Sequence, residues 1–354
     1  MTTRHFLVRL HLWFGLTLGL VWAVQGLTGA ALVFHRELDR WGVKITSGPM
    51  APVDRLIAAA ERQAGTPVRM LSVADSKGGI LQASYKDAHG YDRNVRLDAA
   101  SARVVDDRSG ASGWRWVYNL HEELLLGDRA STLVGLTGLF LASIAATGLW
   151  LGWPRRRGSL AALTPSQWQG RRQKLRSWHR MWGLTAAAVL IIVALSGAAT
   201  VLRPQLWSLL QRTTPFRPPY KAAGPLPERM VTAGDAWSAA QRVFPDGRFV
   251  RVTMPVAGSP AYYVRVLRPG EIRAWSGTSS VVVDAGSGRI LARHDALTAP
   301  WPNRLYDAVF SLHNGEAAGV VGRLLVLLAG LALPVLYVTG LLSWWRRRKI
   351  RVAG

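Results

Sequence analysis

The chain has 354 residues, no cysteine and a formal net charge of +23. The absence of thiols excludes a disulfide-stapled secreted domain, a cysteine-ligated iron–sulfur cluster and a thiolate zinc site. Long uncharged runs, a mean hydropathy of +0.11 and 16 tryptophans, several of them near the ends of those runs, are instead typical of a protein that spans the lipid bilayer.

The positive charge is concentrated in three segments that carry no acidic residue: the amino terminus, the connection 154–179 and the tail 346–354. Such an arrangement marks the cytoplasmic side of a membrane protein, whereas the two long loops between the apolar runs are only mildly basic. We therefore expect a multi-pass protein of the bacterial inner (cytoplasmic) membrane with both termini in the cytoplasm. The same distribution argues against nucleic acid as a partner.

The first span is predicted over residues 10–34, a run without charge that is long enough for one helix to cross about 30 Å of hydrocarbon. Its pattern recurs later in the chain without a gap. The matched residues are His11, Gly15, Leu16, Thr17, Leu27 and Gly29 in the first copy and His179, Gly183, Leu184, Thr185, Leu195 and Gly197 in the second.

Residues 36–114 have the composition of a soluble domain. Apolar residues recur at helical spacing over Asp54–Gln63, and they alternate with polar residues over Ile80–Tyr85 and Asn94–Leu97, which predicts one helix and two strands. Residues 115–153 follow as an amphipathic lead-in, Arg115–Gly127, and a second span that ends at Pro154.

The second half repeats this order. After the basic connection 154–179 we expect a third span over 180–202, a second outer domain over 203–305, and a lead-in with the fourth span over 306–345, before the basic tail 346–354. The second outer domain is predicted to hold a helix and three strands, which are Ala236–Phe244 and then Val250–Met254, Ala261–Leu267 and Ser280–Asp284.

The return helices and the outer domains also match between the halves, with Leu120 and His121 against Leu312 and His313, and DAASARV at Asp98 against DAGSGRI at Asp284. The fold class that follows is a mainly α membrane protein, in which four transmembrane helices form a tandem-repeat bundle with two small α+β periplasmic domains. Two copies of the same orientation imply a pseudo-twofold axis along the membrane normal.

Four histidines occupy matched positions of the repeat. The symmetry is expected to bring His11 near His179 at the inner side of the membrane and His121 near His313 at the outer side. Two opposed neutral imidazoles suit the iron of a haem, so the pattern predicts two b-type haems with these residues as iron ligands. The alternative is that the histidines hydrogen-bond to loops or lipid head groups at the helix ends.

Other residues are weaker candidates for the haem sites. His35, at the outer end of the first span, is a further possible ligand in place of His121 or His313. Haem propionates need cationic partners, for which Arg203 and Arg323 are candidates at the outer end. At the inner end the candidates are Arg9, Arg176 and Arg180. Ordinary snorkelling of these long side chains to the membrane surface is the competing interpretation.

The segments LHLWFGLTLGL, LTGAALVFHRELDRW, NLHEELLLG, ATGLWLGWPRR, SWHRMWGL and SLHNGEAAGVVGRLLVLLAGLALPVLYVTGLLSWWRRR resemble the PepSY-associated transmembrane family, and VVVDAGSGRIL resembles the close of a PepSY-like outer domain. The resemblance covers nearly the whole chain and extends to ferric-siderophore reductases of the FoxB type. It implies two b-type haems held by transmembrane histidines, for which His11, His121, His179 and His313 are the matching positions.

The expected function is electron transfer from quinol or a cytoplasmic flavoprotein to a ferric siderophore or other ferric chelate at the periplasmic face. No dinucleotide-binding or phosphate-loop motif is present, so a separate electron donor is implied. The alternatives are a haemless scaffold or regulator whose outer domains bind a protein or peptide, and a transporter of iron or its chelates. Acidic residues would be expected along a transport path within the spans, and the predicted spans contain none.

Overall fold

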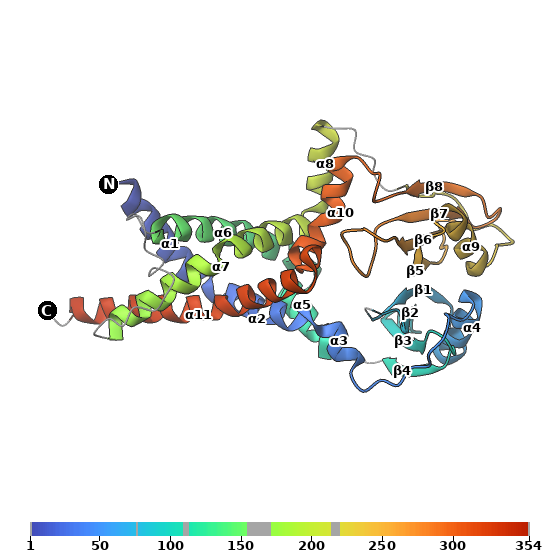
Figure 1. Cartoon of the computed structure of the whole chain (residues 1–354), viewed down its shortest axis with the longest axis horizontal. Coiled ribbons are helices and arrows are strands. Elements are labelled where there is room, and N and C mark those ends of the chain that lie inside the picture. The colour runs from blue at the N-terminus through green and yellow to red at the C-terminus, as the bar shows by residue number, and fades with distance from the viewer. Residues whose placement is uncertain (1, 76, 109–112, 154–170, 214–219, 353–354) are drawn as a thin grey trace. The chain divides into compact units, whose positions relative to one another are not determined.

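The computed structural model describes residues 2–75, 77–108, 113–153, 171–213 and 220–352, and it divides into two compact units (Figure 1). The helical unit consists of Met1–Phe34, Gly113–Leu206 and Val309–Gly354, and the sheet unit consists of His35–Ser112 and Trp207–Ala308. Each unit therefore takes segments from both halves of the chain. Much of the predicted basic connection, residues 154–170 with three of its arginines, lies outside the described residues.

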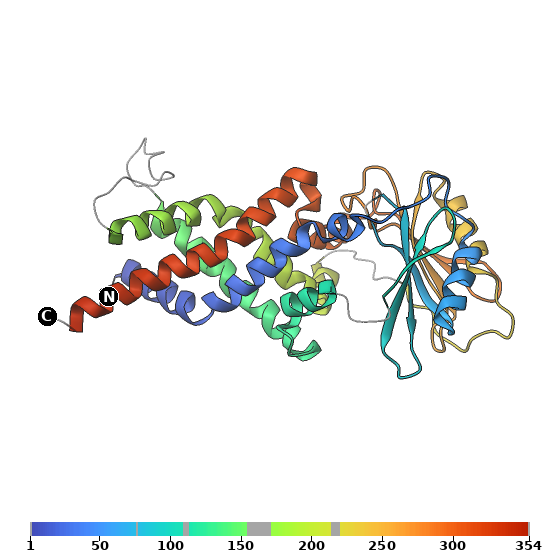
Figure 2. The same ribbon diagram turned by 90° about the horizontal axis from the view of Figure 1, so that it is seen from below.

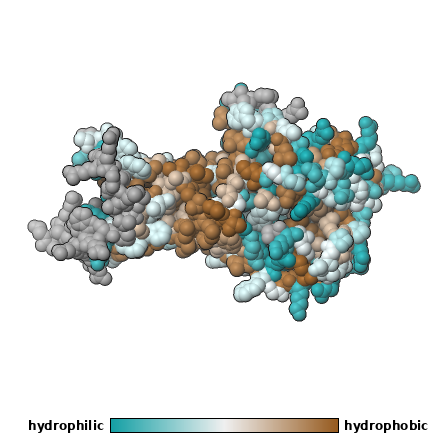
Figure 3. All heavy atoms as spheres, in the orientation of Figure 1, coloured by the Kyte–Doolittle hydropathy of each residue, from teal (hydrophilic) through white to brown (hydrophobic). Residues whose placement is uncertain are grey.

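The helical unit is formed by helices that run side by side (Figure 2). Its elements are α1 (Thr3–Thr17), α2 (Gly19–Val33), α5 (Gly113–Glu123), α6 (Asp128–Gly152), α7 (Arg171–Val201), the short helix η2 (Glu316–Ala318) and α11 (Gly319–Val352). Within the described ranges, three helices are long and apolar enough to cross a membrane, over Ala130–Gly152, Lys174–Val201 and Glu316–Arg346. Apolar side chains dominate the surface of this unit between its ends (Figure 3). Two further helices, α8 (Arg203–Thr213) and α10 (Trp301–His313), continue from one unit into the other.

The first span is not the single helix that its uncharged run predicts. It breaks at Leu18 into α1 and α2, whose axes differ by 62°, so the fourth candidate span is this bent pair. The hydroxyl of Thr17 donates to the carbonyl of Trp13 at 2.8 Å, a back-bond that bends helices, and Gly19 adds backbone freedom at the break. Gly19 also lies against Tyr337 of α11, where a Cβ atom would be 2.6 Å from the ring.

The sheet unit contains one antiparallel sheet of eight strands in the order β4-β3-β2-β1-β5-β6-β7-β8. Its elements are α3 (His35–Arg40), α4 (Val53–Ala64), β1 (Val68–Val73), β2 (Ile80–Lys86), β3 (Asp92–Asp98), β4 (Val104–Arg108), α9 (Ala233–Val243), β5 (Arg248–Thr253), β6 (Ala261–Leu267), β7 (Ser280–Asp284) and β8 (Ile290–His294). Each half supplies a helix and four antiparallel strands in chain order. Strands β1 and β5 meet at the centre of the sheet, and the later strands of each half, β2 to β4 and β6 to β8, extend outward from them.

Both halves share one hydrophobic core. Helices α4 and α9 cover the same face of the sheet (Figure 2), and Leu56 and Ala236 on them are fully buried together with Leu71 and Val252 on the central strands. The expectation of two separate small domains is therefore corrected to one. Strand β1 would leave an unpaired edge in an isolated first half, and pairing with β5 satisfies that edge.

Sequence patterns found the predicted helices and strands of the sheet unit but missed β1, β4 and β8. These strands are short, and polar residues such as Arg69, Asp106 and Arg293 interrupt the alternation that marks a half-buried strand. In the helical unit α7 begins at Arg171, before the predicted start at residue 180. Hydropathy locates only the apolar part of a helix, whereas the basic residues before it continue the same helix.

Candidate functional site: two histidine pairs in the helical unit

The four repeated histidines form two pairs, each with one member from either half of the chain. The ring centres of His11 on α1 and His179 on α7 are 6.2 Å apart, with the ring planes at 83°. Those of His121 on α5 and His313 on α10 are 6.1 Å apart, at 42°. The adjacency that the repeat predicts is confirmed for both pairs, whereas iron ligation stays a prediction.

Each histidine is anchored through its Nδ1 atom to another helix of its own half. Nδ1 of His121 lies 3.0 Å from the carbonyl of Gln25, that of His179 lies 3.1 Å from the carbonyl of Leu336, and that of His313 lies 2.9 Å from the carbonyl of Val193. The backbone of Ile144 is the corresponding neighbour of the His11 imidazole. A carbonyl only accepts, so Nδ1 carries the proton and Nε2 keeps its lone pair for a ligand.

Hydroxyl groups supplement these carbonyls at three of the four positions. Thr28 and Thr339 place Oγ1 3.1 Å from Nδ1 of His121 and His179, and Thr147 places Oγ1 3.4 Å from Nδ1 of His11. Each threonine follows the accepting carbonyl by three residues. Ser196 holds the equivalent position beside His313, and like the three threonines it donates to carbonyls of its own helix.

A glycine follows each of these hydroxyl residues and lies against the imidazole. An added Cβ would be 2.9 Å from Cε1 of His11 at Gly148, 2.7 Å from Cε1 of His313 at Gly197, and 3.4 Å from Cε1 of His179 at Gly340. These side chains therefore rest on helix backbone rather than on other side chains, and the distance between two helices sets where Nε2 points.

We call each hydroxyl residue with the glycine after it a hydroxyl–glycine seat. These seats were not predicted, although the sequence carries a signal for them. A hydroxyl residue followed by glycine occurs at a matched position of each predicted span, as Thr28-Gly29, Thr147-Gly148, Ser196-Gly197 and Thr339-Gly340, and the second span carries a further such pair, Thr137-Gly138. Gly29 and Gly197 are among the residues that match in the sequence repeat. Their contacts with histidines of other helices depend on how the helices pack, which no local pattern reports.

The inner pair borders a cavity of about 660 Å³. Its walls come from α1, α2, α6, α7 and α11 and are mostly aliphatic, and His11 and His179 both line it. Arg4, Arg176 and Arg180 line it as well, and Nε of Arg180 donates to the carbonyl of Gly152 at 2.9 Å. The volume lies within the range of about 300–1,000 Å³ that is usual for cofactor pockets.

The remaining predicted site residues have other surroundings. Arg323 donates to the carbonyl of Val33 at 2.6 Å and lies over the ring of Phe34, with 4.2 Å to the ring centre, so it caps the carboxyl end of α2. Arg203 begins α8. His35 begins α3 and belongs to the sheet unit, so the structure does not group it with either histidine pair.

The residues present fit a haem at each pair. Two imidazoles that bind one metal atom from opposite sides, with metal–nitrogen bonds of about 2 Å, have ring centres about 6 Å apart, as both pairs do. Among the described residues no group of three or more His, Cys, Asp or Glu side chains could hold a metal ion. Two ligands are too few for a protein-only site but are the number that a porphyrin leaves open.

The sequence model of one protein family, described as the PepSY-associated TM region, matches residues 8–347, which is nearly the whole chain. The match includes all four paired histidines, the four hydroxyl–glycine seats and the eight strands of the sheet unit. No curated protein matches the chain.

Proposed function

We propose, because the chain belongs to the PepSY-associated transmembrane family, that it is a di-haem b electron-transfer protein of the bacterial inner membrane, which reduces a ferric siderophore or another ferric chelate on the periplasmic side. The observation that carries the proposal is the pair of imidazoles 6.2 Å apart at one end of the helical unit and the pair 6.1 Å apart at the other.

In this proposal His11 and His179 hold the inner haem, and His121 and His313 hold the outer haem. Bound haem supplies an iron centre that accepts and releases one electron at a time. The chain contributes the geometry. His179 and Gly197, the seat of His313, are separated on α7 by a rise of about 27 Å, so the two pairs lie near the two sides of a bilayer.

The Nδ1–H bonds have two effects on the proposed ligands. They fix the tautomer, so that Nε2 of each ring is available, and they increase the electron density on that nitrogen. Arg4, Arg176 and Arg180 border the inner cavity and are suited to pair with haem propionates there. Arg323 and Arg203 are the corresponding candidates at the outer end, where Arg323 also caps α2.

The ends of the proposed electron path follow from charge and chemistry. The basic segments favour the cytoplasm for both termini, so the donor at that side would be quinol or a flavoprotein. At the opposite side the acceptor would be a ferric chelate. Reduction releases iron because Fe²⁺ is held far more weakly than Fe³⁺ by the hard oxygen ligands of a siderophore.

Absorption spectroscopy of the purified protein tests this proposal. We expect a Soret band and, after dithionite, a sharp α band, with about two haems per chain. His11→Ala and His121→Ala should each remove about half of the haem, and His89→Ala, in an exposed turn of the sheet unit, should remove none. Protein that stays colourless after expression with ample haem would contradict the proposal and favour a membrane-anchored scaffold. Stopped-flow oxidation of the reduced protein by ferric chelates then identifies the acceptor.

A further inference from the structure

A row of polar side chains crosses the face of the sheet opposite α4 and α9. Paired strands place Arg96, Gln82, Ser72, Arg251, Arg265, Ser280 and His294 side by side from β3 to β8. We call this row the polar face. Its neighbours along each strand, such as Leu71 and Val264, point into the hydrophobic core on the other side. The polar face is thus continuous across the β1–β5 pair that joins the two halves.

The positive charge on the polar face is balanced in the first half of the chain but not at Arg251. NH1 of Arg96 lies 3.4 Å from a carboxylate oxygen of Asp39 and 3.7 Å from one of Asp106. The side chain of Arg251, on the central strand β5, makes no hydrogen bond or ion pair within the described part of the chain, and its Nε is buried. Burial and the nearby positive charge of Arg273 both lower the pKa of Arg251. A half-buried cation without a counterion is costly, and a bound anion would offset that cost.

Arg273 comes from a loop that distinguishes the two halves. Strands β2 and β3 are joined by the short turn 87–91, whereas the equivalent strands β6 and β7 are joined by residues 268–279. The longer loop also carries Trp275, and the guanidinium carbon of Arg36 lies 4.1 Å from the centre of its ring. The second half therefore adds a loop whose Arg273 lies close enough to Arg251 for their charges to interact.

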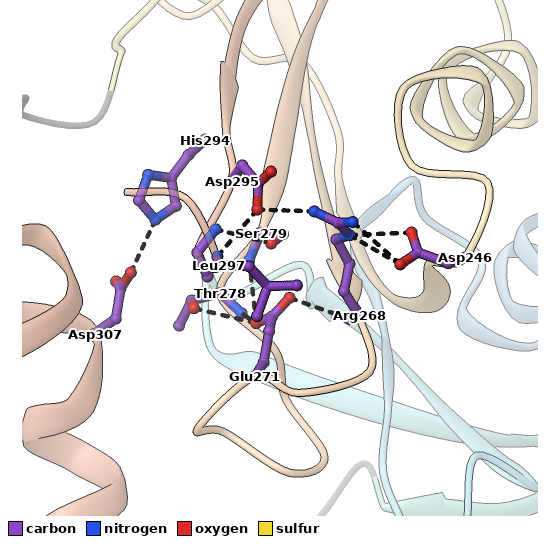
Figure 4. Close-up of polar contacts among 10 residues, drawn as sticks. Asp246, Arg268, Glu271, Thr278, Ser279, His294, Asp295, Leu297 and Asp307 are labelled. Atoms are coloured by element: carbon purple, nitrogen blue, oxygen red, sulfur yellow. Dashed lines mark hydrogen bonds and ion pairs between the residues drawn. The ribbon is translucent and has the colours of Figure 1, made fainter. Parts of the chain in front are cut away.

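A polar network holds this loop in one conformation (Figure 4). The carboxylate of Glu271 accepts from the amides of Arg268 and Thr278, and the first of these bonds is 3.0 Å long. Arg268 in turn binds Asp246 through two nitrogens and Asp295 at 2.8 Å. Gly277 has a φ of +45°, and a Cβ atom there would collide with the carbonyl of Val266. These contacts anchor both ends of the loop that carries Arg273, and such preorganisation lowers the entropic cost of binding.

We propose that Arg251 on the polar face and Arg273 in the loop 268–279 bind the acceptor itself, and that they select an anionic, oxygen-rich chelate such as a tris-catecholate over a neutral one. This inference rests on the proposed function for the identity of the ligand. Guanidinium groups match the paired oxygens of catecholates and carboxylates, and these charge-assisted hydrogen bonds are about twice as strong as neutral ones. The site would give the chain a preference for the charge of the chelate.

Binding of redox-inert gallium(III) chelates to the full chain in phosphatidylcholine nanodiscs tests the proposal by calorimetry. A trianionic hexadentate tris-catecholate should bind more tightly than a neutral hexadentate trihydroxamate, and added KCl should weaken only the former. Arg251→Gln and Arg273→Gln should each weaken binding of the tris-catecholate about ten- to hundred-fold. Arg251→Lys should weaken it less, because the charge remains. Arg242→Gln, at an exposed position on α9, is the matched control and should change affinity less than about two-fold.

The stability of the variants separates binding from folding. Because Arg251 lacks a partner within the described residues, Arg251→Gln should leave the unfolding temperature unchanged or raise it. A lowered unfolding temperature would assign Arg251 a structural role and overturn the proposal. Equal affinity for both chelates, or equal effects of Arg251→Gln and Arg242→Gln, would also overturn it.

Gallium does not accept an electron under these conditions, so this measurement is independent of the haem spectrum. A colourless protein that prefers the tris-catecholate would refute the electron-transfer function and keep the binding site. A di-haem protein without any preference between the two chelates would keep the electron-transfer function and refute the binding site.

Discussion

Gly29 of α2 and His121 of α5 approach so closely that a Cβ atom on the glycine would lie 2.8 Å from Cε1 of the imidazole. Nδ1 of the same ring donates to the carbonyl of Gln25, and the hydroxyl of Thr28 also lies within hydrogen-bond distance of Nδ1. A single turn of α2 therefore fixes the position and the tautomer of the histidine, and the ring then faces His313 from the other half. The geometry of each proposed iron ligand is set by helix packing within its own half of the chain.

The glycine seat of His313 can be tested on α7. Gly197→Ala would place a Cβ 2.7 Å from Cε1 of His313, so the imidazole must move from its position beside His121. We therefore expect loss of the proposed outer haem, and the haem content should fall from about two per chain toward one. Gly113→Ala, at the exposed start of α5, brings a Cβ within 4 Å of no neighbouring atom in the described residues and should keep both haems. Pyridine haemochrome assays give the stoichiometry. Equal haem content in the two variants would show that the close approach does not matter.

The hydroxyl at Nδ1 of His179 should tune the potential of the inner haem. Thr339→Val removes one of the two acceptors for the Nδ1–H group and leaves the carbonyl of Leu336, so the ligand becomes a poorer electron donor. We expect the midpoint potential to rise by roughly 20–60 mV, which corresponds to one hydrogen bond. Spectroelectrochemical titration measures it. Thr185→Val is the control, because that hydroxyl donates only to carbonyls of α7; a rise of the same size there would argue against an effect through His179.

The two pairs differ in ring orientation, which predicts two distinct electron paramagnetic resonance signals. The rings of His11 and His179 are nearly perpendicular at 83°, whereas those of His121 and His313 are inclined at 42°. Perpendicular imidazole planes make two iron d orbitals nearly equal in energy. The oxidised inner haem should therefore give the more anisotropic low-spin spectrum. His11→Ala should remove that signal and leave the other; its survival in this variant would contradict the assignment.

Acid stability should depend on Asp98 in the sheet unit. Burial alone raises the pKa of this carboxyl, but hydrogen bonds from the amides of Ser101 and Thr46 hold the pKa at about 2. Because this value lies below that of the unfolded chain, the carboxylate stabilises the folded state above about pH 4, by about 2 kcal/mol, and the contribution disappears as the pH falls toward 2. Thermal unfolding of the full chain in detergent measures this.

Asp98→Asn should accordingly lower the unfolding temperature at pH 7 and have a smaller effect near pH 3. Asp92→Asn is the matched control, since Asp92 is exposed and forms only a surface ion pair with Lys86. A stability difference for Asp98→Asn that stays constant down to pH 2 would contradict the proposed role of the charge.

Several features of the protein could be predicted from its sequence because each leaves a local signature. Uncharged runs mark the spans, and apolar spacing identifies α4 and α9. The repeated histidines could also be paired correctly, since a duplicated chain with one orientation places equivalent positions symmetrically. These signals depend on neighbouring residues or on self-similarity.

Tertiary structure decided what depends on residues far apart in the chain. The break at Leu18, the single sheet formed through β1 and β5, and the capping of α2 by Arg323 could not be derived from local patterns. The hydroxyl–glycine seats were visible as dipeptides. Only the packing of one helix against another shows that an imidazole lies against the glycine and that its Nδ1 bonds to the carbonyl three residues before the hydroxyl residue, as in the bond from His313 to Val193. Contacts of this kind follow from the distances between helices and strands, which a sequence does not contain locally.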